Sequence, residues 1–176
     1  LPVWIPGSYL VREFSRHLQG MSARQGSREC AMVQTSKHTW EISCDPKRPL
    51  RISYQVYAFD PSVRAAFLDM QRGFFNGTSL FLQAHGHTEQ AHALELRPPK
   101  GSKGWRVATG LPPKKIDKNG FGSYLACDYD ELIDAPFELG TFWSGQFKAA
   151  GVTHQVVVTG AWPSFDGERL LKDTQR

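Results

Sequence analysis

The stretch R-I-S-Y-Q-V-Y-A-F at residues 51–59 decides the fold class, because it alternates apolar and polar side chains. Polar residues occupy positions 51, 53 and 55, and the apolar face consists of Ile52, Tyr54, Val56 and Ala58. A period of two residues is typical of a β-strand with one face buried and the other in solvent. The stretch therefore predicts a half-buried strand.

Similar alternation, or enrichment in β-branched and aromatic residues, recurs along the whole chain. The further strands that it predicts are Ala31–Val33, Thr39–Ser43, His92–Leu96, Arg106–Thr109, Tyr124–Cys127, Phe137–Phe142 and His154–Thr159. Many short strands predict a mainly β fold, here an antiparallel, sandwich-like sheet domain with at most one or two short helices.

Two neighbouring segments are read from turn chemistry. Asn76-Gly77 lies between Phe74-Phe75 and residues 78–82, and this dipeptide tolerates the positive φ angles of a type I′ turn. It predicts a tight hairpin. Residues 61–71 fit a short helix that begins after Asp60, but an extended arm leading into the hairpin fits equally well, so both alternatives stay open.

The remaining segments suggest how the chain is organised. Residues 98–122 are rich in Pro, Gly and Lys, so residues 111–115 are predicted to form a long exposed loop between strands. Residues 164–171 predict the start of a helix. The Pro6-Gly7 pair predicts a turn that forms either a packed corner or a ligand shelf. We expect a β-domain over residues 1–162 that lacks its first strands, and over residues 163–176 the start of a linker or helix into a further domain.

Charge and hydropathy argue against two partner classes. The net charge is +4. A surface that binds nucleic acid would have stacking aromatic residues among its basic ones, but the most basic segment has none between Trp105 and Phe121. No apolar run approaches the roughly 20 residues that cross a bilayer. We expect neither a nucleic-acid partner nor a membrane span, and the compartment stays open between cytoplasm and periplasm.

Self-sufficient catalytic motifs are missing from the sequence. It contains no H-E-x-x-H, no G-x-S-x-G and no phosphate-binding glycine-rich loop. His85, His87, Glu89 and His92 resemble a metal site only weakly, and an exposed polar loop is the favoured interpretation. The acidic stretch at residues 128–134 could serve acid–base or metal chemistry, but a polar turn between two strands is favoured. The three cysteines are expected to be reduced thiols.

Five stretches, in the same order along the chain, resemble one family. They are L-P-V-W-I-P-G-S-Y-L-V-R-E-F-S-R-H at 1–17, Y-Q-V-Y-A-F-D-P-S-V-R-A-A-F-L-D at 54–69, G-F-F-N-G-T-S-L-F-L at 73–82, Y-L-A-C-D-Y-D-E-L-I-D-A-P-F-E-L-G-T-F at 124–142 and G-V-T-H-Q-V-V-V-T-G-A-W at 151–162. They resemble the N-terminal domain of glycyl aminopeptidase-like zinc metallopeptidases, a gluzincin family.

The resemblance implies a β-domain in front of a thermolysin-like catalytic domain of the same protein, which removes N-terminal residues, glycine preferred, from peptides. It also implies that zinc and its ligands belong to that catalytic domain, so no catalytic residue, metal ligand or cofactor is expected in this chain. The full-length parent is expected to be a zinc aminopeptidase.

Substrate-binding candidates follow from the same resemblance. Related aminopeptidases use the equivalent domain as one wall of the cleft, and the α-amine of a peptide is a cation, so a carboxylate or amide oxygen would hold it. The candidates are Gln71, Asn76, Glu131 and Asp134. The alternative function is a stand-alone β-sandwich module that binds carbohydrate or protein around Trp4, Trp105 and Trp143.

Overall fold

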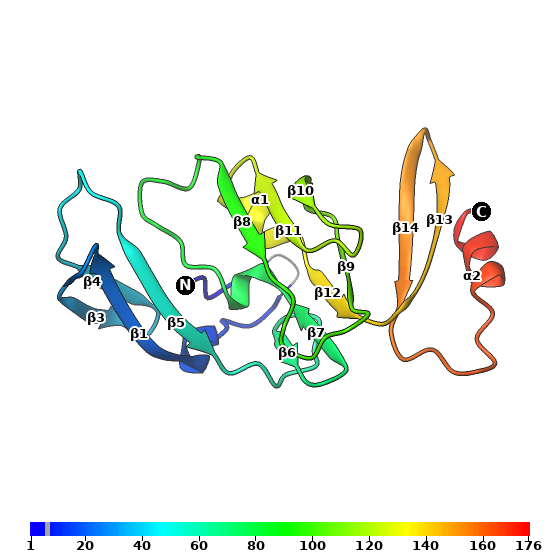
Figure 1. The fold of residues 1–176 in the computed structure, drawn as a ribbon, viewed down its shortest axis with the longest axis horizontal. Helices are drawn as coiled ribbons and strands as arrows, with labels where there is room; N and C mark the ends of the chain where they lie inside the picture. Colours follow the sequence, from blue (N-terminus) through cyan, green and yellow to red (C-terminus); the bar gives the residue numbers. More distant parts are fainter. Residues whose placement is uncertain (6–7) are drawn as a thin grey trace.

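The computed structural model describes residues 1–5 and 8–176, so the predicted Pro6-Gly7 turn lies outside the described residues. Strands dominate the described part of the chain (Figure 1). They are β1 (Leu18–Gln25), β2 (Arg28–Glu29), β3 (Met32–Ser36), β4 (Thr39–Ile42), β5 (Arg51–Val56), β6 (Ala66–Leu68), β7 (Arg72–Phe75), β8 (His92–Leu96), β9 (Arg106–Thr109), β10 (Pro113–Ile116), β11 (Gly122–Ala126), β12 (Phe137–Gly140), β13 (Trp143–Ala149) and β14 (Val152–Val158). The helices are α1 (Tyr129–Asp134), α2 (Gly167–Thr174) and the 3₁₀ turns η1 (Phe14–His17) and η2 (Gly77–Ser79).

The strands form several small antiparallel sheets. The largest has the order β6-β7-β12-β9, and two three-stranded sheets have the orders β2-β1-β5 and β10-β11-β8. Two further sheets are hairpins, β3–β4 and β13–β14. The predicted mainly β class with one or two short helices is confirmed. Neither α-helix is long or apolar enough to pass through a bilayer.

One hydrophobic core joins the sheet that contains β12 to the sheet that contains β11. Phe137 of β12 is fully buried, stacks on Phe75 of β7 at 4.8 Å between ring centroids and meets Tyr124 of β11 edge-on at 5.5 Å. Leu132 of α1 and Leu139 are buried in the same cluster. Aromatic pairs in these geometries add about 1 kcal/mol each beyond their buried area.

The predicted strand at 51–59 is confirmed over residues 51–56 as β5, where burial alternates as the sequence predicts. Its pairing partner β1 has no comparable pattern, because polar residues and a positive-φ glycine, Gly20, interrupt it. The predicted exposed loop at 111–115 is only partly right: Leu111 is buried in the core, and residues 113–116 are exposed but form an edge strand that pairs with β11. Sheet pairing therefore overrides weak local signals here.

The predicted Asn76-Gly77 hairpin is wrong. Asn76 has φ −92° and ψ 131°, which is extended backbone, and its side-chain oxygen accepts a hydrogen bond from the Thr78 amide at 3.2 Å. Asn76 thus caps η2, and the next strand that the structure describes after η2, β8, pairs with β11 and not with β7. The same ability of asparagine to bond its own backbone serves turns and caps alike, so the dipeptide alone could not distinguish the two.

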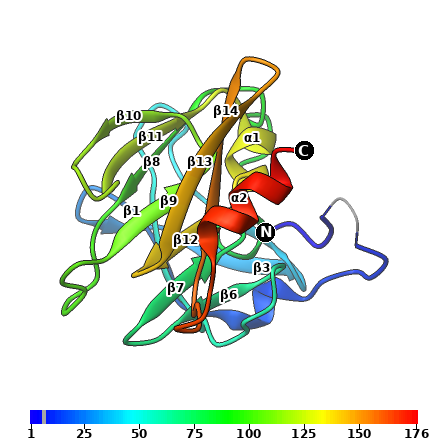
Figure 2. The same cartoon turned by 90° about the vertical axis from the view of Figure 1, so that its right-hand side faces the viewer.

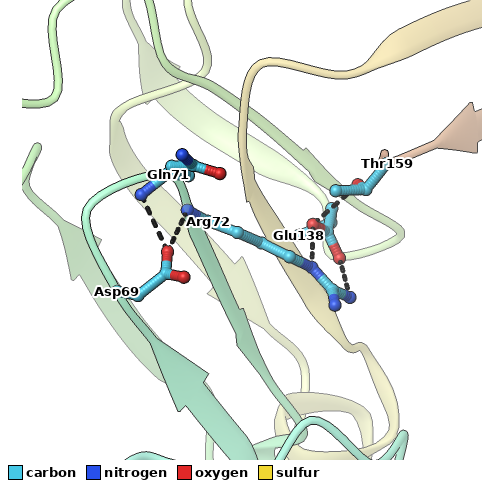
Figure 3. Close-up of polar contacts among 5 residues, drawn as sticks. All are labelled: Asp69, Gln71, Arg72, Glu138 and Thr159. Atoms are coloured by element: carbon cyan, nitrogen blue, oxygen red, sulfur yellow. Dashed lines mark hydrogen bonds and ion pairs between the residues drawn. The ribbon is translucent and has the colours of Figure 1, made fainter. Parts of the chain in front are cut away.

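Residues 61–71 adopt the extended alternative. β6 pairs with β7, and the turn between them closes where the Asp69 carboxylate accepts hydrogen bonds from the amides of Gln71 and Arg72, both at 2.7 Å (Figure 3). The apolar spacing that fitted a helix instead leaves Val63 and Met70 exposed, at 70% and 81%. The real hairpin of this region is therefore β6–β7.

The β13–β14 hairpin and α2 stand apart from the other sheets at one end of the molecule (Figure 1), and Figure 2 shows α2 beside the hairpin. The predicted helix start near residue 164 is confirmed, since Asp166 caps α2 by accepting from the Arg169 amide at 2.9 Å.

Candidate functional site

The acidic stretch at residues 128–134 forms a helix, not the favoured polar turn. Asp128 accepts a hydrogen bond from the Glu131 amide at 2.7 Å, and the Glu131 carboxylate in turn accepts from the Cys127 amide. The arrangement resembles a capping box, except that Glu131 bonds the amide of the residue before the N-cap; Asp128 satisfies an amide that the first helical turn leaves without a partner. Two carboxylates of the stretch are thus used to start α1.

Helix α1 is fixed to the body of the domain from two sides. The buried Tyr129 hydroxyl donates to the Phe81 carbonyl at 2.7 Å, and the Tyr129 amide donates to the Thr88 carbonyl at 2.8 Å. Burial raises the pKa of Tyr129 far above its ordinary value, so the hydroxyl stays a donor at neutral pH. On the other side, Gly77 packs so closely that an added Cβ would lie 2.8 Å from the Ile133 Cα.

An open cavity of about 820 Å³ lies between α1, η2 and the N-terminal segment. The residues that line it are Pro2, Trp4, Ile5, Asn76, Thr78, Gln83, Cys127, Asp128, Tyr129, Asp130, Glu131, Ile133 and Asp134. Four of these are carboxylates and none is Lys, Arg or His. A site with this charge favours a cation over an anion.

Three of the four predicted substrate-binding residues, Asn76, Glu131 and Asp134, lie around this cavity. Asn76 and Glu131 already serve as capping groups, because their side-chain oxygens accept hydrogen bonds from backbone amides. Asp134 is exposed at the last position of α1 and makes no hydrogen bond or ion pair within residues 1–5 and 8–176. It is therefore the candidate whose carboxylate is free for a ligand.

Gln71 lies elsewhere, in the β6–β7 turn beside a polar network (Figure 3). In that network Arg72 of β7 donates to both carboxylate oxygens of Glu138 on β12, at 2.8 and 2.9 Å, and the Thr159 hydroxyl donates to the same carboxylate at 2.8 Å. The hydrogen bonds to Glu138 raise the pKa of Arg72. These contacts link β7 and β12 of the four-stranded sheet to the end of the β13–β14 hairpin, so their role is to hold the fold together.

Sequence reasoning missed several residues that build the cavity. Tyr129 and Gly77 hold its wall, and Ile5 lines it from the N-terminal segment. One signal was available: Asp128 followed three residues later by Glu131 is a capping-box pattern, and it indicates a helix where a turn was favoured. Nothing local marks Gly77, whose close contact is with residues more than fifty positions away.

Histidine and cysteine chemistry finds no support in the described residues. His85 and His87 are exposed in a loop, and among residues 1–5 and 8–176 no three His, Cys, Asp or Glu side chains are grouped to hold a metal. The three cysteines are free, with Cys30 buried and Cys44 and Cys127 exposed. The Glu131 carboxylate raises the pKa of the Cys127 thiol, which disfavours the reactive thiolate.

The tryptophans of the alternative binding module do not share a surface. Trp4 is exposed, but Trp105 is buried in the core, and Trp143 packs edge-on against Phe165 beside α2. An aromatic platform for carbohydrate requires exposed rings that lie together. The geometry therefore does not favour a carbohydrate-binding surface built on these three residues.

Comparison with known proteins gives two findings. The family model of the peptidase M61 N-terminal domain matches residues 1–141. A crystal structure of an aminopeptidase N family protein from Idiomarina loihiensis is 41% identical and superposes with a TM-score of 0.94. The match covers 99% of this chain but only 30% of that protein, so the chain spans less than a third of its length. No curated protein matches the chain.

Proposed function

Since this chain belongs to the M61 peptidase family through its N-terminal domain, we propose that it is the non-catalytic front domain of a zinc-dependent aminopeptidase. The parent enzyme would release N-terminal residues from peptides, glycine preferentially. The observation that carries the proposal is the family match over residues 1–141, together with the 41% identical aminopeptidase-family structure.

The described residues do not fit a zinc site, because they contain no group of three potential ligands. We accordingly assign the metal to the thermolysin-like catalytic domain that the family resemblance implies, in the same polypeptide. This chain would supply the packing surface for that domain and one wall of the substrate cleft. The domain boundary near residue 162 that the sequence suggests is part of the same proposal.

The wall that we propose is the acidic cavity between α1 and η2. A peptide with a free N-terminus carries a positive α-amine, and the cavity offers the exposed Asp134 carboxylate with no competing cation in its lining. Asn76 and Glu131 would shape the wall and not bind the amine directly, because their oxygens are engaged in capping. Gln71 lies in another turn and would not take part.

The overall proposal is tested on the full-length protein. We expect one zinc ion per molecule by metal analysis and faster hydrolysis of glycyl than of leucyl p-nitroanilide. A metal-free preparation should lose hydrolysis and regain it with added zinc. A full-length protein that contains no zinc and cleaves no aminoacyl anilide would refute the proposal.

The cavity is tested separately with Asp134→Asn, which removes the charge and leaves the shape. Loss of one exposed charge contact is expected to raise KM for a peptide with a free amine about fivefold, corresponding to roughly 1 kcal/mol, with kcat little changed. Gln71→Ala is the matched control and should leave KM unchanged. Equal KM values for Asp134→Asn and the unaltered enzyme would show that Asp134 does not bind the substrate amine.

A further inference from the structure

A second open groove, of about 730 Å³, lies between the N-terminal segment, η1 and the turn that joins β3 to β4. Its charged lining consists of Arg12, Arg16, Lys37, His38 and a single carboxylate, that of Glu13. We call it the basic groove. Its charge is the reverse of that of the acidic cavity, so it favours an anion.

The N-terminal segment borders both sites. Trp4 and Ile5 line the acidic cavity, whereas Val3 lines the basic groove. The Arg12 amide donates to the Val3 carbonyl at 2.6 Å, which fixes the part of the chain that carries Arg12 beside Val3. An acidic and a basic site thus share one stretch of backbone but no lining residue.

The hairpin side of the basic groove is held in place by hydrogen bonds. The Lys37 carbonyl accepts from the Ser15 hydroxyl at 2.6 Å and from the Gln34 side-chain amide at 3.2 Å. The Ser36 hydroxyl accepts from the His38 amide at 3.3 Å. These contacts fix the turn, so the groove is formed before a ligand binds, which lowers the ordering cost of binding.

Two of the cations have no carboxylate partner. Arg12 and Arg16 form no ion pair within residues 1–5 and 8–176, whereas Lys37 is paired with Glu13 at 3.1 Å. A guanidinium presents its N–H groups in a planar fork that fits a carboxylate. The two arginines are therefore the groups of the lining that can hold an anion.

Both guanidinium groups are oriented through their Nε atoms. Arg12, which is half-buried, donates to the Ser8 hydroxyl at 3.0 Å, and Arg16 donates to the His17 ring at 3.2 Å. Burial, and then the Arg16 charge, lower the pKa of His17, so its ring is neutral at pH 7 and can accept. Asp60 is close to Arg12 but forms an ion pair with neither arginine in the described part of the chain.

The uncharged lining favours a peptide over a small ion. Val3 and Val11 add apolar surface, and Val11 is 74% exposed. An inorganic phosphate would fill little of the groove and leave that surface in water, whereas an extended peptide alternates its side chains and can offer carboxylates and aliphatic groups in turn. None of the described lining residues is aromatic, as stacking of nucleic-acid bases would need.

We propose that the basic groove binds an acidic segment of a partner protein in extended conformation. Its carboxylates bind Arg12 and Arg16, and its aliphatic side chains pack against Val3 and Val11. The proposal goes beyond the aminopeptidase activity and does not rest on it, because every residue involved lies in this chain and none lines the acidic cavity.

Fluorescence anisotropy on the full-length protein tests the proposal. The probe is a fluorescein-labelled, N-acetylated peptide of alternating glutamate and valine, and its control has glutamine in place of glutamate. Acetylation removes the α-amine, so the probe is neither a cation for the acidic cavity nor a substrate for an aminopeptidase. We expect saturable binding of the glutamate peptide with a Kd about tenfold below that of the glutamine peptide.

Three substitutions in the groove and one outside it locate the binding. Arg12→Gln should raise the Kd of the glutamate peptide about tenfold, and Arg16→Gln, at an exposed position, about threefold. Arg12→Lys keeps the charge but loses the planar fork, so its Kd should lie between those of Arg12→Gln and the unaltered protein. Arg28→Gln removes the same charge from an exposed position on β2 and should leave the Kd unchanged. Urea unfolding checks that each variant is folded, and Arg16→Gln keeps the test decisive if Arg12→Gln is destabilised.

The proposal is overturned if the glutamate peptide does not bind, if the two peptides bind equally, or if Arg28→Gln weakens binding as much as Arg12→Gln. Tighter binding of a phosphatidylserine vesicle or a single-stranded oligonucleotide, with the same loss in Arg12→Gln, would overturn it as well, because the ligand would then be a lipid surface or a nucleic acid. Neither zinc nor hydrolysis is measured, so failure of this proposal is distinguishable from failure of the peptidase proposal.

Discussion

Replacing Gly77 by alanine tests how the wall of the acidic cavity is held. An added Cβ would lie 2.8 Å from the Ile133 Cα, 2.9 Å from the Leu132 carbonyl oxygen and 3.1 Å from the Phe81 ring. The first two contacts are with backbone of α1, which a side-chain rotation cannot relieve. Helix α1 or η2 must therefore shift by several tenths of an ångström.

The expected cost follows from two opposing effects. Overpacking a well-packed site costs about 1–3 kcal/mol, whereas Gly→Ala at a compatible backbone position gains about 0.4–1 kcal/mol by restricting the unfolded chain. The net expectation for Gly77→Ala is a loss of about 1–2 kcal/mol in the free energy of unfolding. For a domain of this size that corresponds to a fall in Tm of roughly 2–8 °C.

Gly110→Ala is the matched control, because an added Cβ there meets nothing within 4 Å and the backbone is not left-handed. Urea unfolding followed by tryptophan fluorescence measures both variants, with the slope m checked for constancy. We expect Gly110→Ala to be neutral or slightly stabilised. If Gly77→Ala unfolds at the same or a higher urea concentration than the unaltered chain, the close approach of η2 to α1 is refuted.

Two further predictions concern buried polar groups. Glu138→Gln should lower the free energy of unfolding by about 2 kcal/mol, because the partly buried Arg72 loses its charged partner. Glu95→Gln, in an exposed ion pair, is the control and should change the free energy of unfolding by less than about 0.5 kcal/mol in the same urea assay. Equal effects of the two substitutions would contradict a structural role for the Arg72–Glu138 pair. Tyr129→Phe should reduce the alkaline sensitivity of stability. The folded pKa of Tyr129 lies above the unfolded value near 10, so its contribution is full below pH 10 and falls by about 1.4 kcal/mol per pH unit above it. Thermal unfolding of the unaltered chain and of Tyr129→Phe between pH 8 and 11.5 measures this difference. Parallel curves of stability against pH for the two proteins would contradict the prediction.

Part of the candidate site could be read from the sequence. Asn76, Glu131 and Asp134 were selected as oxygen donors for a cationic ligand, and the fold gathers them around one cavity. Gln71 was selected by its nearness to Asn76 in the sequence. It lies instead in a turn that the Asp69 carboxylate closes, because the β6–β7 hairpin was not recognised.

The wrong hairpin at Asn76-Gly77 and the helix alternative at residues 61–71 have one physical cause: the same short sequence can form hydrogen bonds in more than one local structure. Asn76 bonds its own backbone in a turn and in a helix cap with the same atoms, so the sequence could not choose between them. Residues 61–71 have a spacing that fits a helix, but the edge of β7 offers backbone hydrogen bonds that only an extended segment can take. The competing partner is close in the sequence in both cases, the Thr78 amide for Asn76 and β7 for residues 66–68, so the same short stretch fits two structures.

What the sequence by itself determined is the class of the chain. The alternation at residues 51–59 predicts a half-buried strand, residues 164–171 predict the start of a helix, and the five ordered stretches carry the family resemblance. Each of these signals depends on residues close together in the sequence. Only the tertiary structure decided which elements meet. The cavity joins the N-terminal segment, η2 and α1, and the hairpin at residues 143–158 separates from the core, because sheet pairing and close backbone contact depend on residues distant in the chain.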